Sequence, residues 1–408
     1  MTDASISGEK NLEAYFGLPA DVRFCKQCVI SNQRPSATVE FRNENAKEAI
    51  HFDEDGVCSA CRYHDIKYNQ INWNERQRML LDLLDQHRKG DGSYDVIVPG
   101  SGGKDSIYVA HVLKHKYGMT PLTVTWPPHM YTDIGRCNFE AWLNAGFDNV
   151  SFHPNRDVHR RLAREAFLNL CHPFQPFILG QKQIGPKMAL KYGAKLIFYG
   201  ESQAEGGTRM AEAFNPVMNT RYYSLPRDQR FDIRLGGKSY GQLIEDGFSR
   251  ADLEPYVPAA REDIVAAGIE VHHMGFYELW RPQDKFYYAV ENTAFMPNPD
   301  RSEGTFSKYA SLDDKMDGLH YFTTFIKFGI GRATYDAAQE IRNRHITREE
   351  GVALIRRYDG EFPAKYFKEF LDYVNIDEDR FWKTIDSYRS PHLWRKDGNA
   401  WMLCHRVT

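Results

Sequence analysis

The chain has 408 residues, 42% hydrophobic and 26% charged, so it can bury a sizeable core and should form two or three structural units. Its formal net charge of −3 disfavours a broad nucleic-acid surface, and the expected partner is a small molecule or a protein. No apolar run could span a membrane and no signal peptide follows Met1, so we expect a cytoplasmic protein.

Four of the seven cysteines form two C-x2-C pairs: Cys25, Cys28, Cys58 and Cys61. Two residues between thiolates let one tight turn direct both sulfur atoms at one ion, and two such turns complete a tetrahedral site. Between the pairs, alternating residues at 37, 39 and 41 and turn residues at 53–56 suit a zinc ribbon. We therefore predict a closed, structural Zn²⁺ site in an N-terminal knuckle over residues 1–70.

Residues 71–202 alternate between predicted helices and strands. A helix that packs against the core is expected over 73–87. Strands are then predicted over 94–99, 122–126, 150–153 and 195–199, and helices over 105–117, 135–146, 157–170 and 181–192. Strands separated by helices predict an α/β core with a doubly wound parallel sheet, which binds its ligand at the carboxyl ends of the strands.

The segment SGGKDS, residues 101–106, lies where the first core strand ends and a helix begins. Its glycines let the backbone approach an anion, the helix N–H groups point at that anion, and Lys104 adds positive charge, so the expected ligand is a phosphate. The Walker A pattern is excluded because Asp105 follows the lysine where Ser or Thr is needed. A β-lactamase site is also disfavoured, because two glycines form a loop here and no Lys-Thr-Gly occurs.

This loop resembles the SGGxDS signature of the PP-loop ATP pyrophosphatases, whose fold is HUP-like. Members of that family cleave ATP between the α and β phosphates, transfer AMP to a substrate oxygen and release pyrophosphate. The resemblance implies that pyrophosphate is cradled by four residues, Ser101, Gly102, Gly103 and Ser106. It also implies that Lys104 neutralises the pyrophosphate charge and that Asp105 helps to hold Mg²⁺.

Nitrogen and sulfur nucleophiles divide this family. A tRNA-thiolating enzyme normally has catalytic cysteines in the core, but Cys137 and Cys171 each stand alone and are explained more simply by packing. No basic cluster with interleaved aromatic residues marks an RNA platform. Nitrogen chemistry is therefore favoured, with a tRNA-thiolating enzyme and a non-catalytic zinc-ribbon adaptor as alternatives.

Five segments resemble the N-acetyl sugar amidotransferases of bacterial surface-polysaccharide biosynthesis, including lipopolysaccharide O-antigen: residues 123–135, 198–202, 315–321, 326–334 and 345–362. The likeness runs from the first C-x2-C pair to about residue 390. It implies that ATP activates the acetamido oxygen of a nucleotide-linked N-acetyl sugar, which ammonia then replaces to give an acetamidino sugar. One departure is Arg281, where relatives are expected to carry an acidic residue.

The source of ammonia is expected to lie outside the chain. Position 2 is Thr, where a glutaminase with an N-terminal nucleophile would need a cysteine. No cysteine stands in the G-x-C-x-G elbow of a triad glutaminase, so neither signature is present. The resemblance implies a separate glutaminase subunit, and a barrel subunit that channels ammonia could accompany it.

Several further residues are candidates for the site. Trp126 could stack on adenine or serve as a core aromatic, and Glu201, beside Ser202 after a late strand, could bind Mg²⁺ or orient ammonia. The candidates for binding substrate are His129, Arg209, Lys327 and Arg332. Arg209 could equally form a surface salt bridge, whereas Lys327 and Arg332 lie in a glycine-rich run at a helix start, which suits an anion.

The second half of the chain has weaker patterns. Residues 203–270 are expected to be an insertion that forms a lid or substrate wall, and residues 271–408 to complete the core and become helical. Thr347 and Glu350 have the spacing of a capping box that opens a helix, and Pro363 is expected to open the next one.

Overall fold

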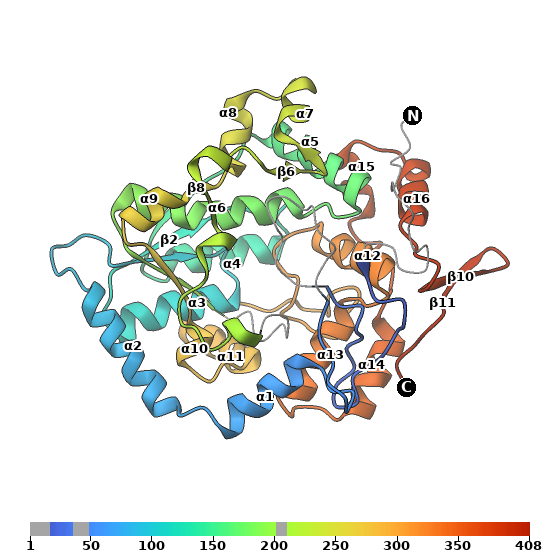
Figure 1. The fold of residues 1–408 in the computed structure, drawn as a ribbon, viewed down its shortest axis with the longest axis horizontal. Coiled ribbons are helices and arrows are strands. Elements are labelled where there is room, and N and C mark those ends of the chain that lie inside the picture. Colours follow the sequence, from blue (N-terminus) through green and yellow to red (C-terminus); the bar gives the residue numbers. More distant parts are fainter. Residues whose placement is uncertain (1–16, 36–48, 201–209) are drawn as a thin grey trace.

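The computed structural model describes residues 17–35, 49–200 and 210–408, and its centre is a five-stranded parallel sheet (Figure 1). The strands are β1 (Val96–Pro99), β2 (Pro121–Thr125), β3 (Asp148–Ser151), β4 (Leu196–Tyr199) and β9 (Glu270–His273). Their order is β3-β2-β1-β4-β9, and every neighbouring pair is parallel. The chain passes from β1 to β2 on one side and returns to β4 on the other, so the topological switch point lies between β1 and β4. This confirms the doubly wound α/β core.

Both faces of the sheet are covered, as the strand sequences require. Ile97 packs with helices α5 (Arg156–Leu170) and α6 (Gln175–Tyr192), whereas Val96 and Val98 face α2 (Trp73–His87) and α3 (Lys104–His111). Because successive side chains of a strand point to opposite faces, a run of apolar residues such as VIVP predicts burial on both sides. The sheet is therefore a rigid platform with only its strand ends available for a ligand.

The core helices begin within two residues of their expected positions, except for α6. The predicted 105–117 helix continues beyond α3 as a π-helical turn, η2 (Val112–Lys116), and α4 (Asp133–Asn144) begins after Thr132, which accepts the Gly135 N–H at 2.9 Å. Helix α6 begins six residues before the predicted residue 181, because Pro176 is tolerated in a first turn. Figure 1 shows α6 lying across the sheet.

The segment between β4 and β9 consists of short elements: η4 (Met210–Glu212), η5 (Thr220–Tyr222), β5 (Ser224–Leu225), η6 (Arg227–Gln229), β6 (Arg234–Leu235), β7 (Lys238–Ser239), α7 (Tyr240–Glu245), α8 (Arg250–Leu253), η7 (Glu254–Tyr256), β8 (Ala259–Ala260) and α9 (Arg261–Ala266). Tyr256 anchors this segment to α5, because its hydroxyl lies 2.7 Å from Nδ1 of the buried His159. The domain boundaries at residues 70, 202 and 270 stay a prediction.

The chain beyond β9 is helical, as expected. Its elements are α10 (Met274–Tyr277), α11 (Pro282–Asn292), α12 (Asp317–Phe328), α13 (Arg332–Arg342), α14 (Arg348–Tyr358), α15 (Phe367–Val374), α16 (Glu378–Ser387) and the hairpin β10 (Trp394–Asp397) with β11 (Ala400–Leu403). The capping box at the start of α14 is present: the Thr347 N–H donates to Glu350 at 2.8 Å, and the Glu350 N–H donates to Thr347 at 3.2 Å.

The prediction that Pro363 opens a helix is wrong, because α15 begins only at Phe367. The N–H of Ala364 donates to the carbonyl of Phe362 at 2.9 Å, which closes a tight turn in place of a helical one. Pro363 packs against Gly318 of α12, where an added Cβ would lie 2.9 Å from the Cβ of the proline.

The N-terminal segment lies against the C-terminal helices, and in Figure 1 the blue chain runs beside the orange helices α13 and α14. Helix α1 (Ser59–Asn69) begins directly after Cys58, contains Cys61 and leads towards the core. Among the helices of the described residues, none is both long and apolar enough to cross a bilayer.

Candidate functional site

A cavity of about 570 Å³ opens at the carboxyl ends of β1 and β4, which is the switch point of the sheet. The 101–106 loop forms one wall, through Ser101, Gly103, Asp105 and Ser106. The end of β4 and one face of α6 form the others. A doubly wound sheet binds its ligand at this place, so the structure puts the predicted phosphate loop where the fold needs it.

Steric contacts require glycine at positions 100 and 102 but not at position 103. Gly102 has φ +89°, and a Cβ there would lie 2.7 Å from the carbonyl oxygen of Asn138 on α4. A Cβ on Gly100 would lie 2.3 Å from the Cβ of Ser106. Gly103, by contrast, has φ −73° and nothing within 4 Å of an added Cβ. The space beside Gly103, at the first N–H groups of α3, is therefore open.

This contrast gives a matched pair of variants. Gly102→Ala is expected to lower the free energy of unfolding by about 1–3 kcal/mol, because the alanine must adopt a left-handed conformation and displace α4. Gly103→Ala should leave the free energy of unfolding nearly unchanged. Chemical denaturation of both variants checks this, and equal stability of the two would contradict the argument.

Lys104 and Asp105 are the charged groups of the loop. The Lys104 ammonium pairs with one carboxylate oxygen of Asp105, and the side chain of Lys104 is only 13% exposed. The other oxygen of Asp105, Oδ1, is buried and has no hydrogen-bond partner within the described part of the chain. A buried oxygen of this kind beside a phosphate cavity fits a hard cation such as Mg²⁺. Lys182 of α6 also lines the cavity and adds positive charge.

The far wall of the cavity is aromatic. The buried ring of Trp126 packs on α6, where a Cβ on Gly180 would lie 2.3 Å from it, and part of the ring lines the cavity. Tyr222 and Tyr223 of the inserted segment lie on the same cavity. Burial raises the pKa of Tyr223 to about 12, and its hydroxyl has no partner among the described residues. An aromatic, weakly polar wall of this kind can accept a flat heterocycle.

His129 lies away from this cavity. Its side chain is fully enclosed, its Nδ1 is 2.7 Å from Oδ2 of Asp314, and its ring stacks on His159 with centroids 4.7 Å apart. Burial lowers the pKa of His159 well below its usual value. The structure therefore places His129 in a buried, packed cluster with Asp314 and His159, and its substrate role stays a prediction.

Two of the remaining site candidates are described by the structure, Lys327 and Arg332, and they contact different parts of the chain. Glu201 and Arg209 lie outside the described residues. Lys327 is buried and donates to the carbonyl of Leu170 at 3.1 Å, on the side of α5.

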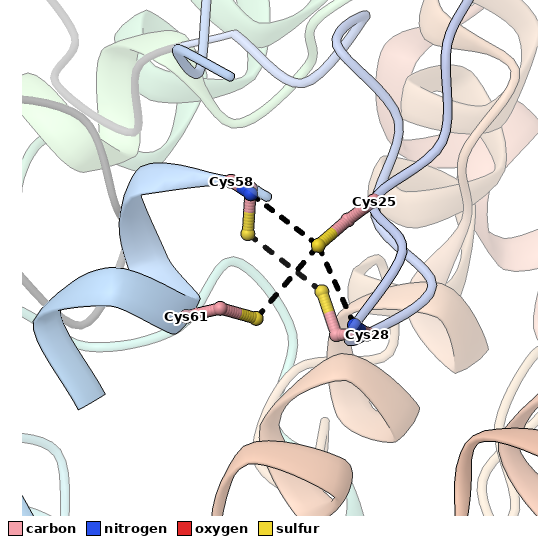
Figure 2. Close-up of side chains that lie close together, drawn as sticks. All are labelled: Cys25, Cys28, Cys58 and Cys61. Atoms are coloured by element: carbon pink, nitrogen blue, oxygen red, sulfur yellow. Dashed lines mark hydrogen bonds between the residues drawn. The ribbon is translucent and has the colours of Figure 1, made fainter. Parts of the chain in front are cut away.

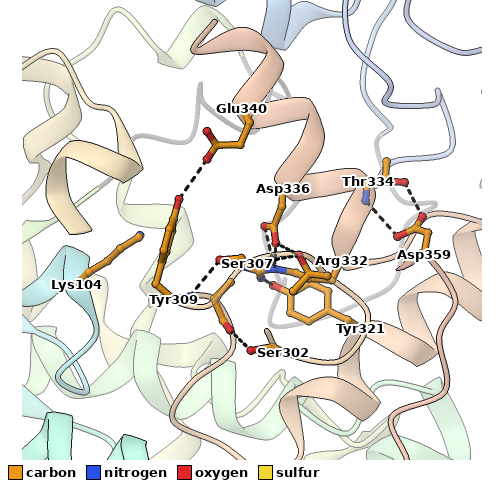
Figure 3. Close-up of polar contacts among 12 residues, drawn as sticks. Lys104, Ser302, Ser307, Tyr309, Tyr321, Arg332, Thr334, Asp336, Glu340 and Asp359 are labelled. Carbon is orange, nitrogen blue, oxygen red and sulfur yellow. Dashed lines mark hydrogen bonds and ion pairs between the residues drawn. The ribbon is translucent and has the colours of Figure 1, made fainter. Parts of the chain in front are cut away.

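Arg332 opens α13, where it pairs with Asp336 at 3.0 Å and donates to the hydroxyl of Tyr321 (Figure 3). The helix start expected to bind an anion is occupied by the chain itself. The carboxylate of Asp359 accepts the N–H of Gly331 at 2.9 Å and both the N–H and the hydroxyl of Thr334, at 3.1 and 2.6 Å.

A second group of polar residues near Lys104 was not predicted. Figure 3 shows the ring of Tyr309 between Lys104 and Glu340, and the Lys104 Nζ is 6.0 Å from the ring centroid. The Tyr309 hydroxyl donates to Glu340 at 3.2 Å, and the other oxygen of Glu340 is 2.5 Å from Nδ1 of His345. A hydroxyl, a carboxylate and an imidazole in contact can move a proton. The spacing of Glu340 and His345, five residues apart at the end of a helix, was the only sequence signal.

The four paired cysteines meet in one buried cluster, with ligand atoms within 4.8 Å of one another (Figure 2). The Sγ atoms of Cys25 and Cys61 are 3.9 Å apart, and those of Cys28 and Cys58 are 3.7 Å apart. Four sulfurs at about 2.3 Å from a tetrahedral Zn²⁺ would lie about 3.8 Å from one another. The donor set therefore fits zinc in a closed site. Residues 37, 39 and 41 of the predicted ribbon lie outside the described residues.

Cations surround this cluster. Nη1 of Arg342 on α13 lies 4.0 Å from the Sγ of Cys28. Burial lowers the pKa of Arg34, and the charges of Cys58 and Cys28 act in the opposite direction, which places this arginine near the cluster. Arg348 of α14 donates to the carbonyl of Cys28 at 3.1 Å. Four thiolates around Zn²⁺ carry two surplus negative charges, which the two arginines can offset. The knuckle and the C-terminal helices therefore form one packed unit.

Comparisons with known proteins give one family match. A sequence model of the C-terminal domain of WbpG-like LPS biosynthesis proteins matches residues 303–408. No curated protein matches the chain. Among solved structures, the NMN synthetase of Francisella tularensis is 13% identical and aligns over 55% of this chain and 96% of its own, but the TM-score of 0.23 gives this likeness no weight.

Proposed function

We propose that the chain is an ATP-dependent, AMP-forming amidotransferase that acts on a nucleotide-linked N-acetyl sugar in the biosynthesis of a bacterial surface polysaccharide. The observation that carries this proposal is the cavity at the switch point of the sheet, with the 101–106 loop as its wall. The match of residues 303–408 to a domain of LPS biosynthesis proteins supports the sugar substrate.

In the proposed reaction the acetamido oxygen attacks the α-phosphorus of ATP. The bond to pyrophosphate breaks, and the amide gives up its N–H proton as the adenylylated intermediate forms. Ammonia then adds to the acetamido carbon, AMP leaves with the former amide oxygen, and the product is an acetamidino sugar. Adenylylation is needed because an amide oxygen is a poor leaving group.

The described residues suit these steps. Ser101, Ser106 and the N–H groups at the start of α3 would hold the pyrophosphate, and Lys104 would offset its growing charge. Asp105 would hold Mg²⁺, and the adenine would lie along Trp126. Glu201 stays a candidate for a second Mg²⁺ ligand.

The four-cysteine site is proposed to hold structural Zn²⁺ in a knuckle over residues 1–70. We also propose a partner glutaminase, with a barrel subunit that channels ammonia, because free ammonia is scarce at neutral pH and competes with water at an activated carbon. Residues 203–270 would then serve as the wall over the nucleotide.

The thiolating alternative has less support. Burial raises the pKa of Cys171 to about 12, which disfavours the thiolate needed for sulfur transfer, and Cys137 is exposed on α4. Neither cysteine lines the cavity at the switch point. The adaptor alternative does not explain why Oδ1 of Asp105 is buried with no hydrogen-bond partner among the described residues.

The proposal predicts how the purified chain uses nitrogen. With ATP and the correct nucleotide-linked N-acetyl sugar, it should release AMP and pyrophosphate in equal amounts and aminate the sugar only at high ammonium concentration. Glutamine should support turnover only when a glutaminase partner is added. Chromatography of nucleotides and mass spectrometry of the sugar measure both; formation of ADP, or sulfur transfer to tRNA, would contradict the proposal.

A further inference from the structure

The hydroxyl of Ser101 is held from behind by a distant residue. It donates a hydrogen bond of 2.8 Å to Oδ2 of Asp313, which lies 212 residues later in the chain. Ser101 lines the nucleotide cavity, whereas Asp313 does not. A serine hydroxyl has a single proton, and a carboxylate can only accept it. In this arrangement the proton of Ser101 therefore points away from the place that a phosphate would take.

The position of Asp313 is fixed by its own neighbours and not by the loop. The N–H of Thr132 donates to the Asp313 carbonyl at 3.1 Å, and the N–H of Lys315 donates to the Met130 carbonyl at 2.8 Å. A Cβ on Gly135 would lie 2.5 Å from the Cα of Asp313, so the start of α4 touches this backbone directly. The backbone of Asp313 is therefore held by the 130–135 segment, independently of the 101–106 loop.

The carboxyl of Asp313 also lacks the kind of basic neighbour that Asp314 and Asp317 have within the described residues. Asp314 contacts Nδ1 of His129, and the charge of Arg332 acts on Asp317, but among the described residues no Lys, Arg or His pairs with Asp313. Burial raises the pKa of Asp313, the hydrogen bond from Ser101 lowers it, and the charge of Asp314 raises it; the net direction is upward. The titratable groups on the segments packed around it are Lys104, Asp105, His129, Tyr131, Asp133, Arg136, Cys137, Asp314, Lys315 and Asp317.

We propose that Asp313 is a positioning residue of the nucleotide site, which takes up a proton when phosphate binds and then holds Ser101 as a donor to that phosphate. The inference rests on the proposed ATP site. With Asp313 ionised, Ser101 has no proton for the phosphate, and a negative charge stands behind it. With Asp313 protonated, the carboxylic acid donates to Oγ of Ser101, whose own proton turns to the phosphate. Solvent supplies the proton, and no covalent bond changes except the O–H of Asp313.

The test compares the wild type with Asp313→Asn, whose amide is a permanent donor. Titration calorimetry with the Mg²⁺ complex of α,β-methylene-ATP, in buffers of different ionisation enthalpy, counts the protons taken up. At a pH between the pKa of Asp313 in the free protein and its higher pKa in the complex, the wild type should take up about one proton more than the variant, and over that range its Kd should rise about tenfold per pH unit relative to the variant. The difference between the two proteins cancels the protons of the nucleotide itself.

Ser101→Ala provides a second arm, because removing the hydroxyl should abolish the extra proton uptake even if Asp313→Asn fails to fold. Asp82→Asn, at an exposed position of α2, is the control and should behave as the wild type. Normal binding with equal proton uptake in the wild type and Asp313→Asn would overturn this inference alone, as would full proton uptake in Ser101→Ala. If none of these folded proteins bound the nucleotide, the proposed ATP site itself would be overturned.

Discussion

Replacing Cys28 by Ser is expected to release one equivalent of metal and to lower the free energy of unfolding by more than about 4 kcal/mol. A closed thiolate site contributes its metal-binding energy directly to folding, and here the site also offsets Arg342 and Arg34. Loss of the metal would leave those cations buried without their counter-charge. Metal analysis and thermal unfolding of the purified variant measure both effects.

Cys137→Ser is the matched control, because Cys137 is exposed on α4 and belongs to no cluster among the described residues. It should keep the metal and the stability of the wild type. A Cys28→Ser protein that was metal-free, equally stable and fully active would exclude a structural role for the cluster.

Lys104→Ala is expected to fold normally and to lose about a hundredfold in turnover, or about 3 kcal/mol of transition-state stabilisation. The Lys104 ammonium is largely shielded from water and stands beside Asp105, where charge on a departing pyrophosphate would build up. Single-turnover release of pyrophosphate, together with the unfolding temperature, separates a chemical defect from a structural one.

Lys191→Ala serves as the control for this variant, because Lys191 lies exposed in the last turn of α6. Its turnover should equal that of the wild type. An unchanged rate for Lys104→Ala would remove the lysine from the proposed mechanism, whereas an equal fall in both variants would indicate a loss of net charge as the cause.

The parts of the molecule that the sequence predicted are those with local causes. The 101–106 loop is defined by six consecutive residues between an apolar strand and a helix, and the C-x2-C pairs by the spacing of two turns. Strand β1 is apolar on both faces because it lies within a parallel sheet. In each case the physical requirement acts over fewer than about ten consecutive residues, so it is visible as a local sequence pattern.

The contacts that sequence reasoning missed join distant parts of the chain. Asp313 meets Ser101 across 212 residues, and nothing in the LDD sequence before α12 shows which of its two aspartates faces the loop. His129 was predicted to bind substrate, and nothing in the sequence shows that its Nδ1 lies 2.7 Å from Oδ2 of Asp314, 185 residues later. The helix start at Gly331 has the composition of an anion site, but Asp359 supplies the anion.

The contact between Arg348 and the carbonyl of Cys28 has a consequence for the order of events during synthesis. The two residues are 320 positions apart, so at about 5–20 residues per second the ribosome needs roughly 16–64 s to deliver the arginine after the cysteine. All four cysteines have been made long before then. During that interval the knuckle stands without α13 and α14, and its thiols are open to oxidation or to the wrong metal. Zinc supply early in translation should therefore influence the yield of native protein more than zinc added after release.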